Sequence, residues 1–264
     1  MKKNIFKLMF VAVAALVLAS CSDVEDKDSY GQTYVENFPV FTDAAGNQLN
    51  GTTITLALGE AFDYDYKATM GDNDVTADTE MSIYDIISGE YVDSIDTTTP
   101  GCYNVYYTGD TEHGLSSWTS TCSVYVYDPE VTTDIAGTYN VDLDKSLYYY
   151  GGWVSYNSEI ARRGLDCTSA TVTVTQLCPG IFQVNDLFGG WYAQVRGYGT
   201  NYNMSGIIML NNDNSIDCLS SKVSAWGDSL DFLDDAKYDP ETESLTWYFG
   251  YAGSIYGIPY MTKM

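Results

Sequence analysis

Aromatic side chains beside glycines are the residues of this 264-residue sequence with the clearest chemical potential. An exposed aromatic ring offers a flat platform to the C–H face of a sugar ring, and polar neighbours can then orient the sugar hydroxyls. The candidate ligand-binding residues all fall in the second half of the chain and are Tyr149, Tyr150, Trp153, Trp191, Tyr192, Arg196 and Trp226. Asp186 and Asp228 are possible hydrogen-bonding partners nearby.

A second interpretation of the same aromatic residues remains open. Trp191, Trp226 and Trp247 could instead fill the interior of a barrel, which is the usual place for a tryptophan in a regular strand. Trp153 and the tyrosines before it lie beside Gly151 and Gly152, where all of the rings cannot easily be core.

Catalytic and metal-binding patterns are missing from the sequence. His113 is the single histidine, so no Ser-His-Asp or Cys-His pair and no Cys/His metal spacing can be assembled. No Gly-rich phosphate loop follows a strand and opens a helix. Paired carboxylates for glycoside hydrolysis remain possible among 36 acidic residues, but no pair stands out. We therefore expect no enzyme activity, no metal and no cofactor.

Charge and composition exclude two further classes. The formal charge is −24, which repels nucleic acid and anionic membrane surfaces. The chain is 45% hydrophobic and 14% aromatic, so it is not a disordered acidic polymer.

The elements that would position these residues are short strands throughout. Residues 32–128 alternate polar and apolar side chains between turn residues, most regularly over 100–107 and 121–127, which predicts a β-sandwich. Residues 129–134 are polar and include Pro129, as expected of a linker.

Residues 135–264 predict a second all-β domain. Further short strands are expected over 171–175, 181–184, 191–196, 204–210, 216–223, 229–232, 236–239 and 245–251. About eight strands in this length fit an up-and-down barrel or a curled sandwich.

The amino terminus predicts export and a lipid anchor. Lys2, Lys3 and Lys7 precede an apolar run that is too short to span a bilayer, and small residues lead to Cys21. This pattern resembles the lipobox of bacterial lipoproteins, which implies cleavage after residue 20 and lipid on Cys21. Residues 21–31 then form an acidic tether, which is similar to the export signal of surface-exposed Bacteroidota lipoproteins. The resemblance implies an outer-membrane protein that faces the cell surface.

Two further resemblances concern the folded part. The Pro100-Gly101-x-Tyr103 stretch resembles immunoglobulin-like modules of bacterial surface proteins, with Tyr103 as the corner tyrosine. Gly137-x-Tyr139 resembles the start of lipocalin-like (calycin) barrels. With residues 185–192 and 238–245, the layout is similar to two-domain lipoproteins of gut Bacteroidota, with an immunoglobulin-like domain before a calycin-like barrel. Members are often encoded with glycan-uptake systems, which implies a polysaccharide or oligosaccharide partner and an outer-membrane uptake complex.

The cysteines leave several pairings open. With Cys21 lipid-modified, Cys102, Cys122, Cys167, Cys178 and Cys218 remain, an odd number. Cys102 with Cys122, or Cys218 with Cys167 or Cys178, are possible disulfides. Cys167 and Cys178 bracket one predicted strand and would lie too far apart to pair.

Three functions are compatible with the sequence. The leading hypothesis is a non-catalytic, surface-anchored glycan-binding lipoprotein whose first domain is a spacer. The second is a lipocalin-like carrier or sensor that encloses a small apolar ligand in its barrel. The third is a structural partner of an outer-membrane complex.

Overall fold

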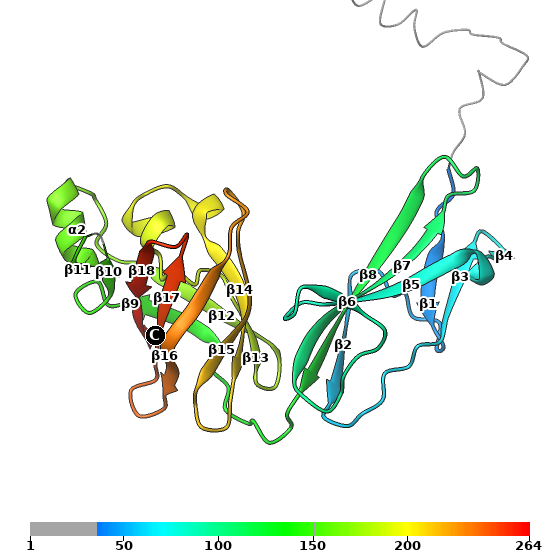
Figure 1. The fold of residues 1–264 in the computed structure, drawn as a ribbon, viewed down its shortest axis with the longest axis horizontal. Coiled ribbons are helices and arrows are strands. Elements are labelled where there is room, and N and C mark those ends of the chain that lie inside the picture. The colour runs from blue at the N-terminus through cyan, green and yellow to red at the C-terminus, as the bar shows by residue number, and fades with distance from the viewer. Residues whose placement is uncertain (1–35, 150) are drawn as a thin grey trace, which may run out of the picture.

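The chain folds into two all-β lobes in a computed structural model that describes residues 36–149 and 151–264 (Figure 1). The first lobe carries strands β1 to β8, and the second lobe carries strands β9 to β19. The predicted all-β class is confirmed. Within the described residues, no helix is long and apolar enough to cross a membrane.

The first lobe is built from two sheets. Its elements are β1 (Val40–Asp43), β2 (Thr52–Ala57), β3 (Tyr66–Met70), β4 (Asn73–Asp74), the 3-10 helix η1 (Thr76–Asp78), β5 (Thr79–Asp85), β6 (Glu90–Val92), β7 (Gly101–Asp110) and β8 (Ser117–Tyr127). One sheet has the order β2-β8-β7-β5-β6, with β2 parallel to β8, and the other has the order β1-β3-β4. Alternate side chains of β7 and β8, such as Val105 and Val124, point into a core that also contains Phe41 and Leu56.

The second lobe is one long antiparallel sheet that curls round on itself. Its elements are β9 (Gly137–Val141), β10 (Leu147–Tyr149), β11 (Trp153–Ser155), α2 (Tyr156–Arg163), β12 (Thr171–Cys178), β13 (Ile181–Val184), the π-helix η2 (Trp191–Val195), the 3-10 helix η3 (Thr200–Tyr202), β14 (Met204–Leu210), β15 (Ile216–Val223), β16 (Leu230–Asp239), β17 (Ser244–Tyr251), β18 (Ile255–Ile258) and β19 (Tyr260–Lys263). The pairing order is β11-β10-β18-β17-β19-β9-β12-β13-β14-β15, and β16 pairs with β17.

The sheet closes where β15, at one end of the pairing order, meets β16. The Ser221 hydroxyl donates to the Leu230 carbonyl and accepts from the Leu230 N–H, both at 2.9 Å. Ser215 and Lys237 form a further bridge between the same two segments. Strands β9, β12, β13, β14, β15, β16, β17 and β19 therefore follow one another around a barrel-like ring, and β10, β11 and β18 extend it at one side.

Large side chains fill the inside of the second lobe. Burial alternates strictly along β14, and nearly so along β17, so one face of each strand points inward. Trp191, Trp247, Phe182 and Phe188 are fully buried there. The Trp247 indole N–H donates to the Leu187 carbonyl at 2.8 Å, which satisfies its polar atom.

Three local expectations were wrong. Residues 191–196 do not form a strand: η2 begins at Trp191 because Gly189 and Gly190 both have positive φ and turn the chain into a helix. The separate strands over 229–232 and 236–239 are one strand, β16, interrupted by register shifts. Helix α2 was missed, although Ser155 accepts from the Ser158 N–H at its start and Gly164 ends it.

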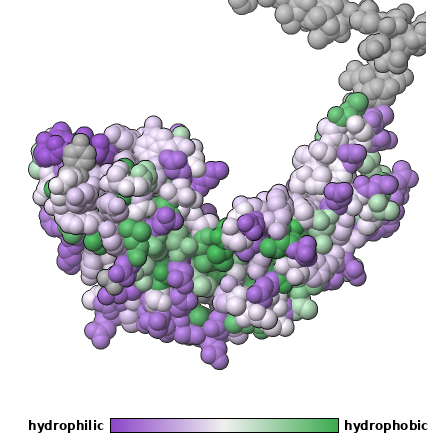
Figure 2. Space-filling view, in the orientation of Figure 1, coloured by the Kyte–Doolittle hydropathy of each residue, from purple (hydrophilic) through white to green (hydrophobic). Residues whose placement is uncertain are grey.

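The two lobes share a small apolar contact surface. Cys102 and Tyr125 of the first lobe pack with Cys178, Ile181 and Leu219 of the second. Figure 2 shows hydrophobic residues gathered where the lobes meet. The Asn212 amide also donates to the Asp128 carboxylate at 3.1 Å across the junction. The lobes are thus packed against each other as well as linked through the chain.

The five described cysteines are all free thiols. The possible Cys102–Cys122 pair is not formed: Cys102 lies opposite Tyr125 on β8, an odd number of residues from Cys122, so the two side chains leave the sheet on opposite faces. Cys122 accordingly belongs to the core of the first lobe, and Cys102 belongs to the contact between lobes. Cys178 also faces that contact, whereas Cys167 and Cys218 pack against the core of the second lobe.

This placement predicts the order in which the thiols react. Burial raises the pKa of Cys102, Cys178 and Cys218 to about 12, and it raises the pKa of Cys167 by less. We expect iodoacetamide at pH 8 to modify Cys167 first in the folded chain and all five thiols in urea, as read by peptide mass spectrometry. Rapid labelling of Cys102 in the folded chain would contradict the packing of the lobes.

Candidate functional site

One group of aromatic rings lies together at one end of the barrel-like ring. This barrel-end cluster consists of Tyr192, Tyr198, Tyr202, Trp226 and Tyr251. Tyr202 and Trp226 have ring centroids 4.9 Å apart, Tyr198 and Tyr202 are 5.3 Å apart, and Tyr192 and Trp226 are 5.1 Å apart. Tyr251 stacks with Trp226 at 6.2 Å. Residues separated by more than 50 positions in the sequence therefore form one surface.

Exposure divides the barrel-end cluster into a base and an outer layer. Tyr192 and Tyr251 are 7% and 6% exposed and form the base. Tyr198 and Trp226 are 46% and 42% exposed, and Tyr202 is half-buried. Aromatic rings gain free energy when they are buried, so exposed rings that lie together are a favourable place for a ligand to stack.

Backbone hydrogen bonds fix the segments that carry these rings. The Tyr198 N–H donates to the Tyr192 carbonyl at 3.1 Å, which folds the chain back after η2. The Ala225 N–H donates to the Asn201 carbonyl at 3.1 Å and ties the turn that holds Trp226 to η3. The exposed rings are therefore held in place before any ligand arrives.

A buried carboxylate organises the base of the cluster. Asp186 is fully buried and accepts hydrogen bonds from the N–H groups of Phe188, Gly190 and Met204 at 3.0–3.1 Å. Burial raises its pKa to about 6, against the lowering effect of these three donors. Gly189 has φ 63° and lies against Pro259, so only glycine fits there. Asp186 thus shapes the turn before η2 and does not face a ligand, which corrects its expected role.

Polar groups border the barrel-end cluster. Arg196 donates to the Tyr198 hydroxyl at 3.0 Å, and its guanidinium lies 5.4 Å from the Tyr198 ring centroid. The Tyr251 hydroxyl donates to the Asp228 carboxylate at 2.9 Å, and burial together with this bond raises the pKa of Tyr251 to about 12. Stacking platforms and charged groups therefore share one surface.

A second aromatic group lies on the sheet extension. This sheet-edge cluster consists of Tyr149, Trp153, Tyr248 and Tyr256. Trp153, which is 45% exposed, meets Tyr149 edge-on at 5.5 Å and Tyr248 at 5.9 Å. Its three tyrosines are half-buried.

The structure separates the residues that the sequence grouped. Tyr192, Arg196 and Trp226 meet at the barrel end, and Tyr149 and Trp153 belong to the sheet edge. Tyr150 and Cys21, the predicted lipid-attachment residue, lie outside the described residues.

Trp191 was predicted to be a stacking platform for a ligand, and the structure corrects this prediction. Its side chain is fully buried, stacked on Tyr148 with ring centroids 4.0 Å apart and packed against Tyr156 at 4.8 Å. The Arg196 guanidinium also lies 5.7 Å from its ring centroid, so the ring has no face left for a ligand. The first turn of η2 points Trp191 inward, so the alternative interpretation of Trp191 and Trp247 as interior residues is the right one for these two, whereas Trp226 is exposed.

Sequence reasoning also missed residues that complete both clusters. Tyr202 and Tyr251 join the barrel end, and Tyr248 and Tyr256 join the sheet edge. Strand alternation could have identified Tyr248, because it lies between the buried Trp247 and Phe249 on β17 and therefore points to the outer face.

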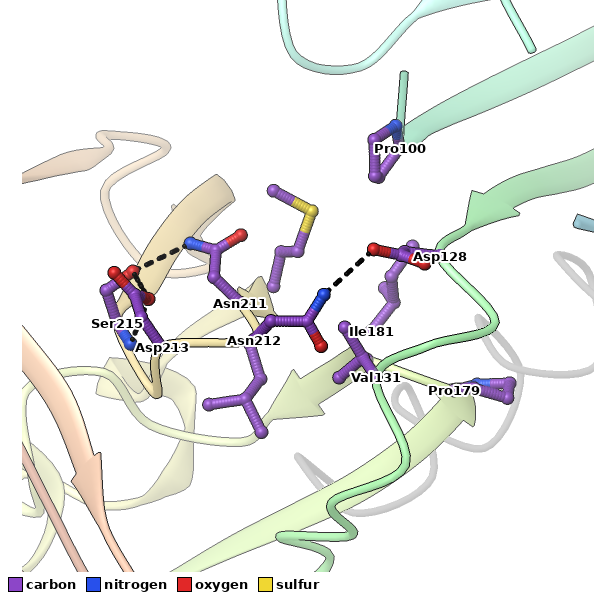
Figure 3. Close-up of a pocket in the computed structure, with 12 residues that line it drawn as sticks. Pro100, Asp128, Val131, Pro179, Ile181, Asn211, Asn212, Asp213 and Ser215 are labelled. Carbon is purple, nitrogen blue, oxygen red and sulfur yellow. Dashed lines mark hydrogen bonds between the residues drawn. The ribbon is translucent and has the colours of Figure 1, made fainter. Parts of the chain in front are cut away.

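A hollow of about 450 Å³ opens between the lobes (Figure 3). It is bordered by Pro100, Asp128 and Val131 on one side and by Ile181 and Asn212 on the other. No aromatic ring lines it among the described residues, so it offers no stacking platform.

Comparisons with known proteins place the chain in a family. A protein-family model described as "-like, C-terminal domain" matches residues 128–261, just over half of the chain. The crystal structure of the lipoprotein BT2262 from Bacteroides thetaiotaomicron is 31% identical over 86% of this chain and 100% of that chain, with a TM-score of 0.43. No curated protein matches the chain. By sequence, the protein belongs to the family of the Bacteroides lipoprotein BT2262.

Proposed function

We propose that this protein is a non-catalytic glycan-binding lipoprotein, anchored through lipid on Cys21 to the outer membrane and exposed at the cell surface. Its ligand is a polysaccharide or oligosaccharide, held at the barrel-end cluster for an outer-membrane uptake complex. The lipobox-like sequence and the related Bacteroides lipoprotein support the anchor.

The first lobe acts as an immunoglobulin-like spacer in this proposal. Tyr103, near the start of β7, donates through its hydroxyl to the Asp96 carbonyl at 3.4 Å. A tyrosine that bonds back to the backbone a few residues upstream is the corner feature of immunoglobulin-like domains. The spacer would hold the second lobe away from the membrane.

The second lobe is a calycin-like barrel that binds on its outside. Trp191, Trp247, Phe182 and Phe188 occupy its interior with full burial, which favours an external ligand over an enclosed one. We therefore do not propose the carrier function.

The main support for the proposal is the two exposed rings of Trp226 and Tyr198. Both rings rest on the buried Tyr192, and Tyr198 also borders Arg196, so a sugar ring could stack while its hydroxyls bond to a charged group. The sheet-edge cluster has an exposed tryptophan too, and rings meet edge-on in both clusters, but at the barrel end the exposed Tyr198 also accepts a hydrogen bond from Arg196.

The test compares two exposed tryptophans in the chain from Ser22 onward. Polysaccharides from plants, hosts and microbes are screened by retardation in native gels. We expect Trp226→Ala to weaken binding of the retarding glycan at least about tenfold, because a central aromatic contact is worth more than 1.4 kcal/mol. Trp153→Ala is the matched control, since it removes a tryptophan of the same exposure from the other cluster.

The outcomes separate the possibilities. Loss of binding in Trp153→Ala, with Trp226→Ala unchanged, would move the site to the sheet edge. No retardation by any glycan in the panel would refute glycan binding and favour a structural role. Circular dichroism of both variants confirms that the fold is retained.

A further inference from the structure

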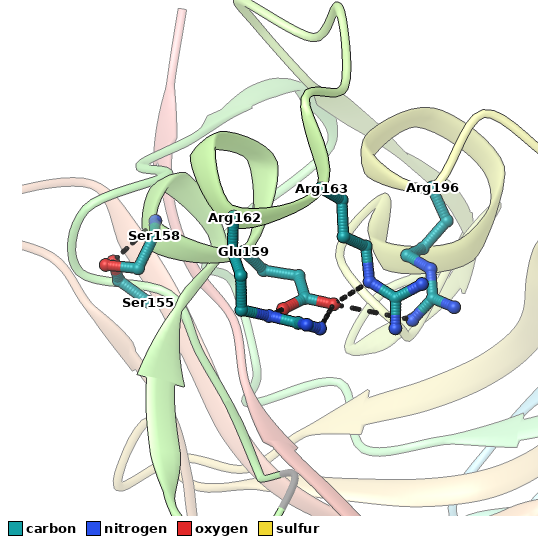
Figure 4. Close-up of polar contacts among 6 residues, drawn as sticks. All are labelled: Ser155, Ser158, Glu159, Arg162, Arg163 and Arg196. Atoms are coloured by element: carbon teal, nitrogen blue, oxygen red, sulfur yellow. Dashed lines mark hydrogen bonds and ion pairs between the residues drawn. The ribbon is translucent and has the colours of Figure 1, made fainter.

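All three arginines of the chain surround one carboxylate, that of Glu159 (Figure 4). Arg162 bonds both carboxylate oxygens, at 2.7 and 2.8 Å. Arg163 bonds one of them, and an Arg196 nitrogen lies 3.9 Å from the same oxygen. In a chain of net charge −24, these arginines form a local region of positive charge.

The local fold explains the geometry. Arg162 and Arg163 lie in the last turn of α2, three and four residues after Glu159, so all three side chains share one side of the helix. Arg196 comes from the end of η2, where its N–H donates to the Trp191 carbonyl at 2.9 Å. The Glu159 side chain is only 4% exposed and holds the guanidiniums together from beneath.

The single Glu159 carboxylate cannot by itself neutralise the guanidiniums of both Arg163 and Arg196. Glu159 supplies one negative charge and about four acceptor positions, whereas each guanidinium carries five N–H donors. The Arg163 side chain is 32% exposed and that of Arg196 is 14% exposed, so both reach the surface while anchored from below. Arginines held in this way suit bidentate recognition of a carboxylate or sulfate.

The arginines adjoin the barrel-end cluster. Arg196 donates to the Tyr198 hydroxyl at 3.0 Å, and Tyr198 contacts Tyr202, which contacts Trp226. A continuous surface therefore runs from the exposed tryptophan through two tyrosines to Arg196 and Arg163.

We propose that the ligand is an acidic glycan, whose carboxylate or sulfate groups pair with Arg163 and Arg196 while its sugar rings stack on Tyr198 and Trp226. This inference rests on the proposed function and names its substrate class. Repulsion by the rest of the chain does not prevent it, because at physiological ionic strength charges more than about 8 Å apart are largely screened.

The test uses chemically matched glycans. Polygalacturonic acid is compared with its carboxyl-reduced form, and chondroitin sulfate with its desulfated form, by calorimetry on the chain from Ser22 onward. We expect binding of at least one acidic member to exceed that of its uncharged or less charged counterpart at least about tenfold, and the pair that differs identifies the anion.

Substitutions of the arginines test where the anionic groups of the glycan bind. Arg163→Gln should lower affinity for the acidic glycan at least about tenfold and leave affinity for the neutral counterpart unchanged, because Arg163 is not among the groups that hold a neutral sugar. Lys145→Gln is the control, because it removes one positive charge from an exposed side chain of the same lobe. Arg163→Lys keeps the charge and the fold but loses the bidentate fork, and it should also weaken binding.

Equal binding of charged and neutral members, or unchanged binding in the arginine variants, would overturn the inference and leave the proposed function standing. Binding only to neutral glycans of the plant, host and microbial panel would likewise overturn the inference and leave the proposed function standing. No binding to any glycan would refute both.

Discussion

Replacing Trp191 with alanine is expected to lower the free energy of unfolding by about 3–5 kcal/mol, the range for a fully buried aromatic residue. The indole is fully buried between Tyr148 and Tyr156, and its loss would leave a cavity beneath the barrel-end cluster. Urea unfolding followed by circular dichroism measures the change. Trp153→Ala, on an exposed ring, is the control and should shift stability by no more than about 0.5 kcal/mol.

Phenylalanine substitutions sharpen this test. The Trp191 indole nitrogen is buried and finds no acceptor among the described residues, whereas the Trp247 nitrogen donates to the Leu187 carbonyl. Trp191→Phe removes an unsatisfied donor, but Trp247→Phe leaves a buried carbonyl without its partner. Trp247→Phe should therefore cost at least about 1 kcal/mol more than Trp191→Phe.

Two results would contradict this account of Trp191. A cost for Trp191→Ala similar to that for Trp153→Ala would mean that the ring is not a core residue. A loss of glycan binding in Trp191→Phe without any loss of stability would return it to the ligand-binding residues.

The all-β class was predictable because burial repeats every second residue. The segment 171–175 alternates in the sequence, and the structure buries its two valines, Val172 and Val174. Met204–Leu210 is mostly apolar in the sequence, but its burial alternates strictly. The closure between β15 and β16 was not predictable, since it depends on a serine side chain and one bridge between segments without a distinctive pattern.

The site was only partly predictable, because the same local composition led to opposite environments. Trp191 and Trp153 both follow Gly-Gly, yet the first is fully buried and the second is 45% exposed. What separates them is the buried carboxylate of Asp186, which directs the chain after Gly190 into η2. The cluster partners Tyr202 and Tyr251 come from distant segments, and a single sequence does not show which distant segments meet.

Asp186→Asn is expected to destabilise the fold by about 1–3 kcal/mol near pH 4, although asparagine has almost the same shape. Asp186 accepts from three N–H groups through two oxygens. The amide nitrogen of asparagine cannot accept, so the Gly190 N–H would face a second donor in a buried place. Because this turn sets the position of η2, glycan binding should weaken together with stability.

The pH dependence of this cost follows from the raised pKa. Burial raises the pKa of Asp186 from 3.8 to about 6, so the folded chain holds the proton more tightly than the unfolded chain does. Its stabilising contribution is fully present below pH 3.8 and is lost as the pH rises through about 6, a change of about 3 kcal/mol. The gap in stability between the native chain and Asp186→Asn should therefore be largest near pH 4 and shrink by pH 7.

Asp239→Asn is a control with the opposite sign. Asp239 also holds a turn, but hydrogen bonds from the Thr242 hydroxyl and the Glu241 N–H lower its pKa. Its contribution is present above its ordinary pKa and is lost as the pH falls, so this variant should approach the native chain in acid. Urea unfolding at pH 4, 5, 6 and 7 measures the trend for Asp186→Asn, and further points at pH 2 and 3 measure the trend for Asp239→Asn. A constant gap for Asp186→Asn from pH 4 to pH 7 would show that the buried carboxyl does not titrate there, and that its role is limited to hydrogen bonding.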